Sequence, residues 1–432
     1  MSKHHAWLQR QIADWVGEGL IDGAQAQTLR ARYPLQKGAG WGRLILSTLG
    51  AIIFGLGVIL LFAYNWAEMH KFTKLAVIFA ALAGAHGAGL WLRQPGRPLI
   101  ASEGLHALGT MLFGAAIWLV AQIYHIEEHY PNALLIWGIG ALAMAWALPS
   151  VTQGLMAVAL VLVWQAVEVF DFSNTLHSTP WIILLGIFPL YWRLRSAVLG
   201  GAATTALLLS LAFSTIELDG ELAAAVVIFT SGAAIGFGRL VAGDPEAKLA
   251  RTGSAFLLPG YAGYLFMLYL CSFPQLGGEL FGLKFVGFQV TAYFATALAL
   301  ALTIWGSVLL APRFGRARSG QWQDLLILFG LLFSAFFSIV GPLGDRWISA
   351  APFNLLLLVH SVLLIVQGSR RMRPRQVVAG CLLLALLAIS RYLDLFDSLL
   401  TRALVFFLIG GVLFAVGNLY SRKSREQKGT TP

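Results

Sequence analysis

Polar and charged side chains stand at the ends of long apolar stretches in this sequence, and they are the first candidates for chemistry. An ionisable or amide group close to a hydrocarbon environment is costly, so each one is a candidate for ligand binding or proton transfer. The candidate substrate-binding residues are Asn65, Glu68, Gln122, Tyr124, Glu168, Asn354, Arg391, Asp394 and Arg402. If several of these side chains converge in one pocket, Arg391 and Arg402 would attract an anionic headgroup or solute there.

A structural explanation exists for the same residues. Helix ends are polar where they meet water and lipid headgroups, and tyrosine and tryptophan anchor them at the interface. Asp394 lies at helical spacing from Arg391, and Asp397 lies close to Arg402, so the charges can pair with each other instead of with a ligand. Both interpretations stay open on the sequence alone.

Two further polar residues are candidates for a proton relay. Glu103 and His106 are three residues apart, a spacing that places both side chains on one face of a helix. Histidine gains and loses a proton near neutral pH, which suits it to a relay. His86 and His360 lie deeper within their apolar stretches. The alternative is that each is a structural histidine, hydrogen-bonded to a neighbouring helix.

One short pattern resembles a metal site. The segment His125-Ile126-Glu127-Glu128-His129 has the HxxEH order of inverted zinc proteases, in which two histidines one turn apart bind zinc. We expect no zinc here, because Tyr130-Pro131 should end the helix and no third ligand is evident. Cys271 and Cys381 are far apart and have no CxxC spacing. No Walker motif or serine nucleophile elbow occurs, so we expect no catalytic residue, metal or cofactor.

The elements that position these residues are transmembrane helices. Of the 432 residues, 58% are hydrophobic and 12% are charged, whereas roughly a quarter of residues in soluble proteins are charged. A helix rises about 1.5 Å per residue, so about 20 apolar residues cross the hydrocarbon core. The apolar stretches predict an all-α transmembrane bundle of about fourteen helices. They lie near 44–66, 75–92, 105–126, 133–149, 154–170, 179–192, 196–215, 222–240, 252–272, 286–311, 323–340, 350–368, 377–393 and 399–420.

Two of these stretches have special features. The stretch at 179–192 is short and interrupted by Pro189, so we expect a re-entrant or strongly tilted segment. The stretch at 222–240 contains Gly232 and Gly236 in a GxxxG pattern, which allows helix backbones to approach closely. We expect this small-residue face to pack within the chain, with a dimer interface as the alternative.

The distribution of Lys and Arg predicts the orientation of the bundle, because cytoplasmic loops carry an excess of both residues. With both termini in the cytoplasm, six of the 30 basic residues fall on the outer side: Lys71, Lys74, Lys284, Arg346, Arg391 and Arg402. The outer loops at 127–129 and 217–221 contain acidic residues. The net charge of +10 therefore reflects orientation, and we expect no nucleic-acid partner, because no soluble domain would present the basic residues.

The chain divides into a cytoplasmic amphipathic helical hairpin at 1–40, a transmembrane helical bundle at 41–421 and a basic cytoplasmic tail at 422–432. In the hairpin, apolar residues recur at helical spacing before glycines interrupt the pattern at 17–19. These apolar residues are Leu8, Ile12, Trp15 and Val16. Asp22 and Gln25 have the spacing of a capping box for a second helix.

Several short motifs resemble those of one bacterial family. They are Trp15-Val16-Gly17-Glu18-Gly19-Leu20-Ile21-Asp22, Gln25-Ala26, Arg32-Tyr33-Pro34, Ala63-Tyr64-Asn65-Trp66, Gly114-Ala115-Ala116-Ile117, Gln122-Ile123-Tyr124-His125-Ile126 and Arg391-Tyr392-Leu393-Asp394. On these motifs the chain resembles a family of predicted bacterial membrane proteins with an N-terminal domain of unknown function. The resemblance implies a multi-spanning inner-membrane protein and brings no established activity.

Many spans, short loops and polar groups scattered within the spans favour a transporter, or a protein that translocates a lipid or solute, with a polar site near the outer leaflet. One alternative is a membrane enzyme that acts on lipid-linked substrates. Another is a non-catalytic scaffold or sensor that uses the hairpin, which deletion of residues 1–36 would discriminate. We expect a multi-pass protein of the bacterial inner membrane, with membrane lipids as partners. The hairpin either binds a cytosolic partner or lies as a cap on the bundle or in the lipid interface.

Overall fold

The structure is a computed structural model of the full chain. It describes residues 11–32, 69–126, 129–243, 253–274, 288–310, 321–341, 346–395, 407, 408, 410–412 and 414. Within these residues the regular elements are helices and no strand occurs, as the sequence predicts for an all-α fold. The chain forms two compact units, Met1–Val77 and Ile78–Pro432.

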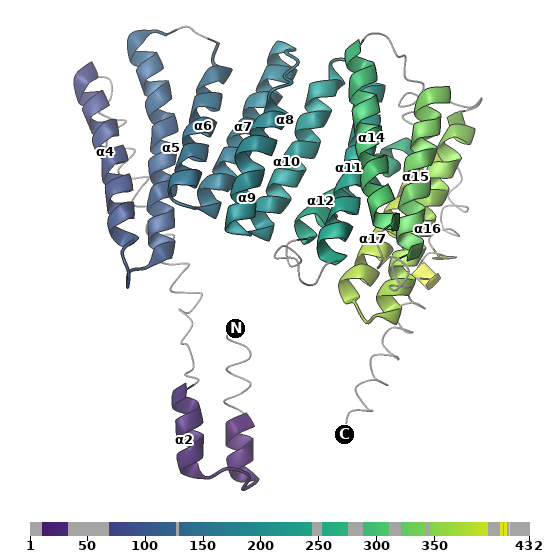
Figure 1. Ribbon diagram of the computed structural model, residues 1–432, viewed down its shortest axis with the longest axis horizontal. Helices are drawn as coiled ribbons and strands as arrows, with labels where there is room; N and C mark the ends of the chain where they lie inside the picture. Colours follow the sequence, from purple (N-terminus) through teal and green to yellow (C-terminus); the bar gives the residue numbers. More distant parts are fainter. Residues whose placement is uncertain are drawn as a thin grey trace. The chain divides into compact units, whose positions relative to one another are not determined.

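The first unit contains the predicted helical hairpin (Figure 1). Residues 11–17 are helical, and the chain then turns at Gly19, whose φ of 72° costs glycine little. The Leu20 N–H donates to Trp15 O at 2.9 Å, and the Gly19 N–H donates to Val16 O at 3.1 Å. These two bonds form a Schellman motif, which satisfies carbonyl groups left open at the helix end.

The second helix of the hairpin, α2 (Gly23–Arg32), begins with the predicted capping box. The Gln25 N–H donates to Asp22 Oδ1 at 2.7 Å, and the Asp22 N–H donates to Gln25 Oε1 at 3.0 Å. Both bonds satisfy N–H groups that the start of a helix leaves without an intrahelical partner. Ile12 and Ala26, one from each helix, are buried, as expected for the apolar side of a hairpin.

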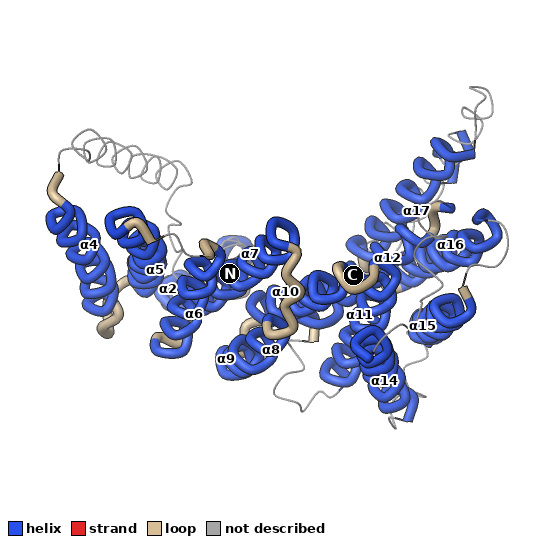
Figure 2. Tube along the Cα trace, turned by 90° about the horizontal axis from the view of Figure 1, so that it is seen from above, coloured by secondary structure: helices blue, strands red, loops and turns tan. Residues whose placement is uncertain are grey.

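In the second unit, helices follow one another through mostly short connections. They are α4 (Lys71–Leu92), α5 (Leu99–Tyr124), α6 (Pro131–Ala147), α7 (Val151–Phe172), α8 (Thr179–Ile182), the π-helix η1 (Ile183–Ile187), α9 (Phe188–Leu194), α10 (Ala197–Ile216), α11 (Gly220–Gly243), α12 (Ser254–Cys271), α14 (Phe288–Leu310), α15 (Gln321–Val340), α16 (Arg346–Arg370) and α17 (Pro374–Leu395). The boundary between the two units falls inside α4. Seen from above, the helices form an elongated array with α4 at one end and α14 to α17 at the other (Figure 2).

Ten described helices are long and apolar enough to cross a membrane, and the apolar helices Pro131–Ala147 and Thr179–Leu194 are shorter. Each coincides with a stretch expected from the sequence, which confirms the helical interpretation for the part of the chain that the structure describes. The stretch expected at 44–66 lies outside the described residues, and the one at 399–420 lies almost wholly outside them.

The expected interruption at Pro189 takes the form of a π-helical turn inside a continuous helix. Proline has no N–H, and its ring clashes with the carbonyl four residues earlier in a regular α-helix. The helix widens into η1 just before Pro189 and returns to α-helical geometry in α9. The Gly186 carbonyl within η1 accepts a hydrogen bond from Trp146 Nε1 at 3.0 Å. A side chain of α6 therefore satisfies a carbonyl in this widened turn.

Small residues allow the helices around α11 to pack closely. A methyl group at Gly232 would lie 2.6 Å from Leu331 Cδ2, and one at Gly236 would lie 2.8 Å from Ile304 Cγ2. The Trp305 Nε1 donates to Gly232 O at 2.9 Å. The GxxxG face of α11 thus packs within the chain against α14 and α15, as expected. Leu331 and Trp305, which contact these glycines, belong to the larger of two clusters of buried hydrophobic side chains.

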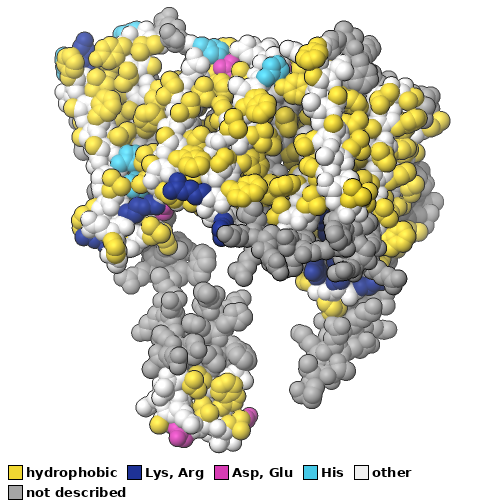
Figure 3. Space-filling view, viewed as in Figure 1, with side chains coloured by type: hydrophobic (Ala, Val, Ile, Leu, Met, Phe, Trp, Pro, Cys, Tyr) yellow, Lys and Arg dark blue, Asp and Glu magenta, His cyan; other side chains and the backbone are white. Residues whose placement is uncertain are grey.

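The helices of the second unit have two ends, which we name by their connections. The connection between α4 and α5 lies at the lower end in Figure 1, called the α4–α5 end, and the connection between α5 and α6 lies at the upper end, called the α5–α6 end. Hydrophobic side chains cover the middle of the face seen in Figure 3, and most of its Lys and Arg side chains lie toward the α4–α5 end. This band of exposed apolar surface is what a helix bundle in lipid presents.

The capping box of α2 is open to a direct test. Replacing Asp22 by alanine removes one of its two hydrogen bonds and should destabilise the helix by about 1 kcal/mol. We expect faster amide hydrogen exchange in the first turn of α2, measured by mass spectrometry on the purified protein. Asp22→Asn keeps a side-chain oxygen and should exchange like the wild type. Unchanged exchange in Asp22→Ala would contradict the role of the capping box.

Candidate functional site

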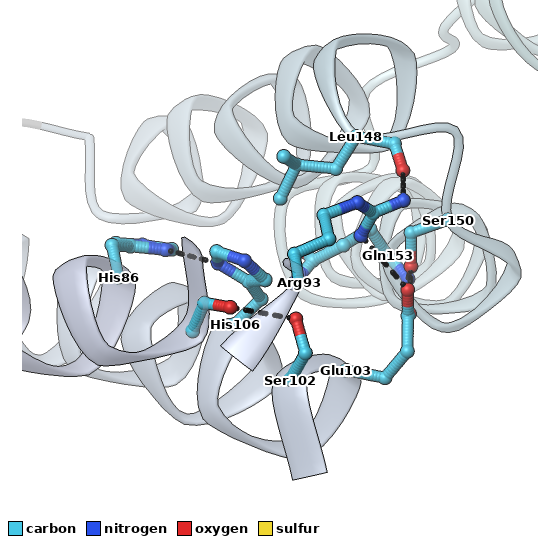
Figure 4. Close-up of polar contacts among 9 residues, drawn as sticks. His86, Arg93, Ser102, Glu103, His106, Leu148, Ser150 and Gln153 are labelled. Carbon is cyan, nitrogen blue, oxygen red and sulfur yellow. Dashed lines mark hydrogen bonds and ion pairs between the residues drawn. The ribbon is translucent and has the colours of Figure 1, made fainter. Parts of the chain in front are cut away.

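A group of polar side chains joins α4, α5 and the start of α7 near the α4–α5 end. We call it the α4–α5 cluster, and its members are His86, Arg93, Ser102, Glu103, His106 and Ser150 (Figure 4). Because α4 and α5 are antiparallel neighbours in the chain, residues close to their connection face each other. Glu103 and His106, the predicted proton-relay residues, both belong to this cluster.

Two histidines lie opposite each other in the cluster. The His86 Nδ1 and His106 Nδ1 atoms are 3.1 Å apart, and the two rings are stacked with centroids 5.4 Å apart. Each ring occupies the space above a glycine of the other helix. A methyl group at Gly89 would lie 2.8 Å from His106 Cε1, and one at Gly109 would lie 2.6 Å from His86 Nε2. The Ser102 Oγ donates to Gly89 O at 2.7 Å and adds a further bond between the helices.

An ion pair lies next to the histidines and extends to the end of α6 and the start of α7. The Arg93 Nη1 lies 3.2 Å from Glu103 Oε1, and the Arg93 Nη2 donates to Leu148 O. The Ser150 Oγ donates to Glu103 Oε2 and accepts from the Gln153 N–H at 3.2 Å, so Ser150 is also the N-cap of α7. The carboxylate of Glu103 is thus held from two sides.

The polar contacts continue one turn further along α5. The Thr110 Oγ1 donates to Gln153 Oε1 at 2.8 Å, and the Trp137 Nε1 donates to Thr110 O at 2.7 Å. Glu103, His106 and Thr110 are three and four residues apart and therefore lie along one face of α5. This face carries polar groups from the α4–α5 end into the interior of the helices.

A second polar group lies at the α5–α6 end and centres on Glu168 of α7. The residue is 4% exposed. Its carboxylate lies 2.8 Å from His129 Nε2 and accepts hydrogen bonds from Asn174 Nδ2 at 2.8 Å and Trp164 Nε1 at 3.2 Å. We call these four residues the Glu168 cluster. A buried carboxylate needs such partners because an unpaired charge away from water is very costly.

Tyr130 lies in the connection between α5 and α6 and links this connection to α7. The Tyr130 hydroxyl donates to Asp171 Oδ2 at 2.9 Å, and its ring lies against Phe172 with centroids 5.4 Å apart. This hydrogen bond raises the pKa of Tyr130 above its ordinary value, because Asp171 favours the protonated phenol. The hydroxyl therefore stays protonated through the physiological range.

An apolar groove of about 440 Å³ lies beside the Glu168 cluster. We call it the α5–α6 groove, since α5 and α6 form most of its walls and Phe79 of α4 closes one side. Its apolar lining includes Phe79, Phe113, Ile117, Trp118, Ala133 and Ile136. Its polar lining comes from His129 and Tyr130, just before α6, and from Asn132 in the first turn of α6. The groove therefore has a long apolar wall and a polar end.

The first histidine of the HxxEH segment lies just beyond the end of α5. The helix α5 ends at Tyr124, and His125 adopts the left-handed conformation with φ of 50°. His129 belongs to the Glu168 cluster instead. Within the described residues no three His, Cys, Asp or Glu side chains are grouped so that they could hold a metal ion.

The predicted substrate-binding residues fall in several places. Asn65, Glu68 and Arg402 lie outside the described residues, as does the side chain of Asp394. Gln122 and Tyr124 are exposed at the end of α5.

Asn354 and Arg391 come together at the end of α12. The Asn354 Nδ2 donates to Ser272 O at 2.9 Å, and the Arg391 guanidinium lies 4.6 Å from the ring centroid of the adjacent Phe273. Glu168 lies on α7, which is well separated from α17 in both views of the helices (Figures 1 and 2). Among the described candidates, Glu168 on the one hand and Asn354 and Arg391 on the other therefore lie in different places.

Sequence reasoning did not identify Arg93, Ser150 or Gln153 as site residues. Each stands at or near a helix end, where polar residues are ordinary, and only the packing of α4, α5 and α7 gives them a common neighbour. The ion pair between Arg239 of α11 and Asp324 of α15, with N···O of 3.2 Å, was also not anticipated. A signal was present in the sequence, since both residues lie within or at the edge of apolar stretches.

Within the described residues, ten helices are apolar and long enough to cross a membrane, and buried polar contacts join several of them, which defines a multi-pass membrane protein. Residues 13–154 of the 432 match the family described as "Predicted membrane protein (DUF2157)", so this part of the chain carries the domain of that family. The match confirms the family resemblance of the N-terminal motifs, and it includes the α4–α5 cluster but not the motif at 391–394. Comparisons with curated proteins and with solved structures found no match.

The contact between the histidines and glycines predicts a stability effect. Gly89→Ala places a methyl group against the His106 ring and should destabilise the protein by about 1–3 kcal/mol through overpacking. Thermal unfolding of the purified protein in detergent would measure it. Gly87→Ala and Gly104→Ala are matched controls, since nothing lies within 4 Å of a methyl group at either position.

A double variant separates this contact from general helix effects. If the methyl group clashes with the imidazole, His106→Ala should remove most of the cost of Gly89→Ala, so the two changes would be non-additive. Additive effects, or a Gly89→Ala variant as stable as Gly87→Ala, would show that a methyl group at position 89 does not clash with the His106 ring.

Proposed function

We propose that the protein binds an amphiphile, a membrane lipid or a lipid-like solute, in the α5–α6 groove and moves it between the two sides of the bacterial inner membrane. The observation that carries this proposal is the groove itself, with its apolar wall and its polar end beside the buried Glu168 carboxylate. An amphiphile has the matching division into an apolar chain and a polar headgroup.

The size and position of the groove support an occupant that enters from lipid. Its volume of about 440 Å³ falls within the range of roughly 300–1,000 Å³ typical of small-molecule sites. Phe79, Trp118 and Ile136 line it and are also exposed on the surface of the helices. A chain in the surrounding lipid can therefore contact the groove wall without first crossing water.

The polar end supports recognition of a headgroup. His129, Tyr130 and Asn132 offer an imidazole, a phenol and an amide there. The contacts of His129 with Glu168 and of Tyr130 with Asp171 fix the two rings in place. Side chains that are already held lose little conformational freedom when a ligand binds.

Movement of the occupant is supported by the interrupted helices. Proline lies within α12 at Pro259 and within α16 at Pro352, and Pro189 follows the π-helix η1. Interrupted helices are typical of transport proteins, where they allow parts of the bundle to move against one another. This part of the proposal rests on analogy of form.

Asn354 and Arg391 form a second position that we propose for an anionic group. The Arg391 guanidinium lies over the Phe273 ring, an arrangement that favours positive charge there. Gln122 and Tyr124 are proposed to contact the headgroup of an occupant of the α5–α6 groove, because both are exposed on α5 near its polar end.

Filling the groove tests the proposal. Ala133 lines the groove, and Ala133→Trp would occupy it, whereas Ala143 lies on the same helix but is exposed and outside the groove. We expect photoactivatable phosphatidylglycerol in nanodiscs to label α5 and α6 of the wild type. Ala133→Trp should reduce this labelling by about tenfold, which corresponds to about 1.4 kcal/mol of binding free energy. Ala143→Trp should leave it unchanged.

Translocation is measured with the same variants in liposomes of phosphatidylethanolamine and phosphatidylglycerol. Fluorescent phosphatidylglycerol in the inner leaflet should become accessible to a membrane-impermeant quencher faster with wild-type protein than with Ala133→Trp. Equal labelling of both alanine variants would contradict the binding site. Labelling without protein-dependent movement would reduce the proposal to lipid binding alone.

We also propose that the complete bundle has about fourteen helices with both termini in the cytoplasm. Support comes from the described basic side chains near the α4–α5 end of the helices, which would face the cytoplasm. They include Arg93, Arg97, Arg193, Arg195, Arg371 and Arg373. Lys71 and Lys74 lie at the start of α4, in the first unit, and do not belong to this group.

A reporter fused to the C-terminus tests this orientation. A reporter active only in the cytoplasm should be active in the fusion, and one active only in the periplasm should be inactive. A second pair of fusions after Arg373, in the connection between α16 and α17, should give the same result, because that connection lies on the proposed cytoplasmic side. Periplasmic activity at either position would overturn the orientation.

A further inference from the structure

We propose that His86 and His106 together form a binding site for one proton, shared between α4 and α5. The carrying observation is the 3.1 Å separation of the two Nδ1 atoms, across which one ring must donate and the other accept. This site is distinct from the α5–α6 groove, and it does not depend on the amphiphile that the groove is proposed to bind.

The hydrogen bond sets the protonation states of the two rings. In the neutral pair, one ring has its proton on Nδ1 and donates, and its Nε2 then carries a lone pair. The other ring accepts at Nδ1 and has its proton on Nε2. An added proton goes from water to the lone pair on the Nε2 of the donor ring. That ring becomes an imidazolium, and the bond between the two Nδ1 atoms remains and becomes charge-assisted.

For a second proton, the pair has no nitrogen lone pair left outside the hydrogen bond. It would have to bind the accepting Nδ1 atom, which would break the hydrogen bond and put two positive rings in contact. The charged groups that the structure places beside the pair are Arg93 of the α4–α5 connection and Glu103 of α5, which neutralise each other in an ion pair. The neighbouring side chain from α7, Gln153, is uncharged. The pair is therefore built for one proton.

The residues around the pair leave room for the two imidazole rings. Gly89 and Gly109 each leave room for the imidazole of the opposite helix, at distances that a methyl group would not allow. His106 is 1% exposed, and its Nε2 atom is buried with no hydrogen-bond partner among the described residues. A buried nitrogen without a partner is costly in a core that serves packing alone, and it is where a proton or a water molecule would add a bond.

Glu103 gives the pair a route to the α4–α5 end. It lies one turn before His106 on the same face of α5, and about a quarter of its side chain is exposed, at 23%. A proton from water at this end reaches the histidines past the Glu103 carboxylate. Because the two rings belong to different helices, taking up the proton strengthens the link between α4 and α5.

The test is a titration of the histidine ring nitrogens. Full-length protein labelled with ¹⁵N-histidine in nanodiscs is followed by nuclear magnetic resonance as the pH falls from roughly 8 to 4. We expect the resonances of His86 and His106 to shift together along one curve, with a total of one imidazolium for the two rings. In His86→Gln or His106→Gln this shared curve should disappear and the remaining ring should shift differently.

His125→Gln is the control, because His125 is exposed at the end of α5 and outside the pair. It should leave the shared curve unchanged. If the variants of the pair do not fold, the resonances of His86 and His106 are assigned in the wild type by replacing the other histidines one at a time. Two independent curves, two imidazoliums, or no protonation of either ring in this range would each overturn the proposal.

Discussion

A hydrocarbon environment offers no hydrogen bonds, and most features of this structure follow from that constraint. Every backbone N–H and C=O group within the membrane must find its partner inside the protein, which leaves the helix as the available element for a chain of this pattern. The same constraint acts on side chains. Glu168, His106 and Gln153 are buried, and each of them is hydrogen-bonded to a group from a neighbouring segment. Polar chemistry in this protein therefore occurs where helices meet.

Close approach between helices is the second requirement, and the smallest residues meet it in two different ways. On α11, Gly232 and Gly236 receive aliphatic and indole side chains, which produces apolar packing with one indole hydrogen bond. Between α4 and α5, Gly89 and Gly109 receive imidazoles. In both cases a glycine provides the space, and the identity of the side chain opposite the glycine decides whether the contact is structural or can take part in chemistry.

Much of the fold follows from local sequence. A stretch of about 20 apolar residues forms a helix in lipid whatever its neighbours are, so positions such as Ala197–Ile216 are predictable to within a few residues. The capping box at Asp22 is equally local, because its two hydrogen bonds join residues three apart. Pro189 predicts an interruption but not its form, since either a kink or a π-helical turn can accommodate a proline.

The sites depend on which helices pack together, and that is not a local property. The spacing of Glu103 and His106 shows that they share a face, yet nothing in the sequence shows that Arg93, Ser150 and His86 lie opposite them. For the same reason, the sequence alone does not show that α7 and α17 are well separated in space. Residues of one polarity at one leaflet can belong to distant helices, because a leaflet has an area as well as a depth.

The π-helix η1 has a consequence for comparing this chain with its relatives. One extra residue is accommodated in this turn, so the helix surface after it is rotated relative to an uninterrupted α-helix by the angle of one residue, about 100°. Leu190 and Tyr191 are fully buried in this frame. A relative that lacks one residue between Ile183 and Ile187 can form an uninterrupted α-helix that keeps the same side of α9 toward lipid, whereas a relative of equal length without the π-helical turn would present a different side. Equivalent positions in such a pair must therefore be matched by the face they occupy, since their order along the chain alone would exchange inside for outside.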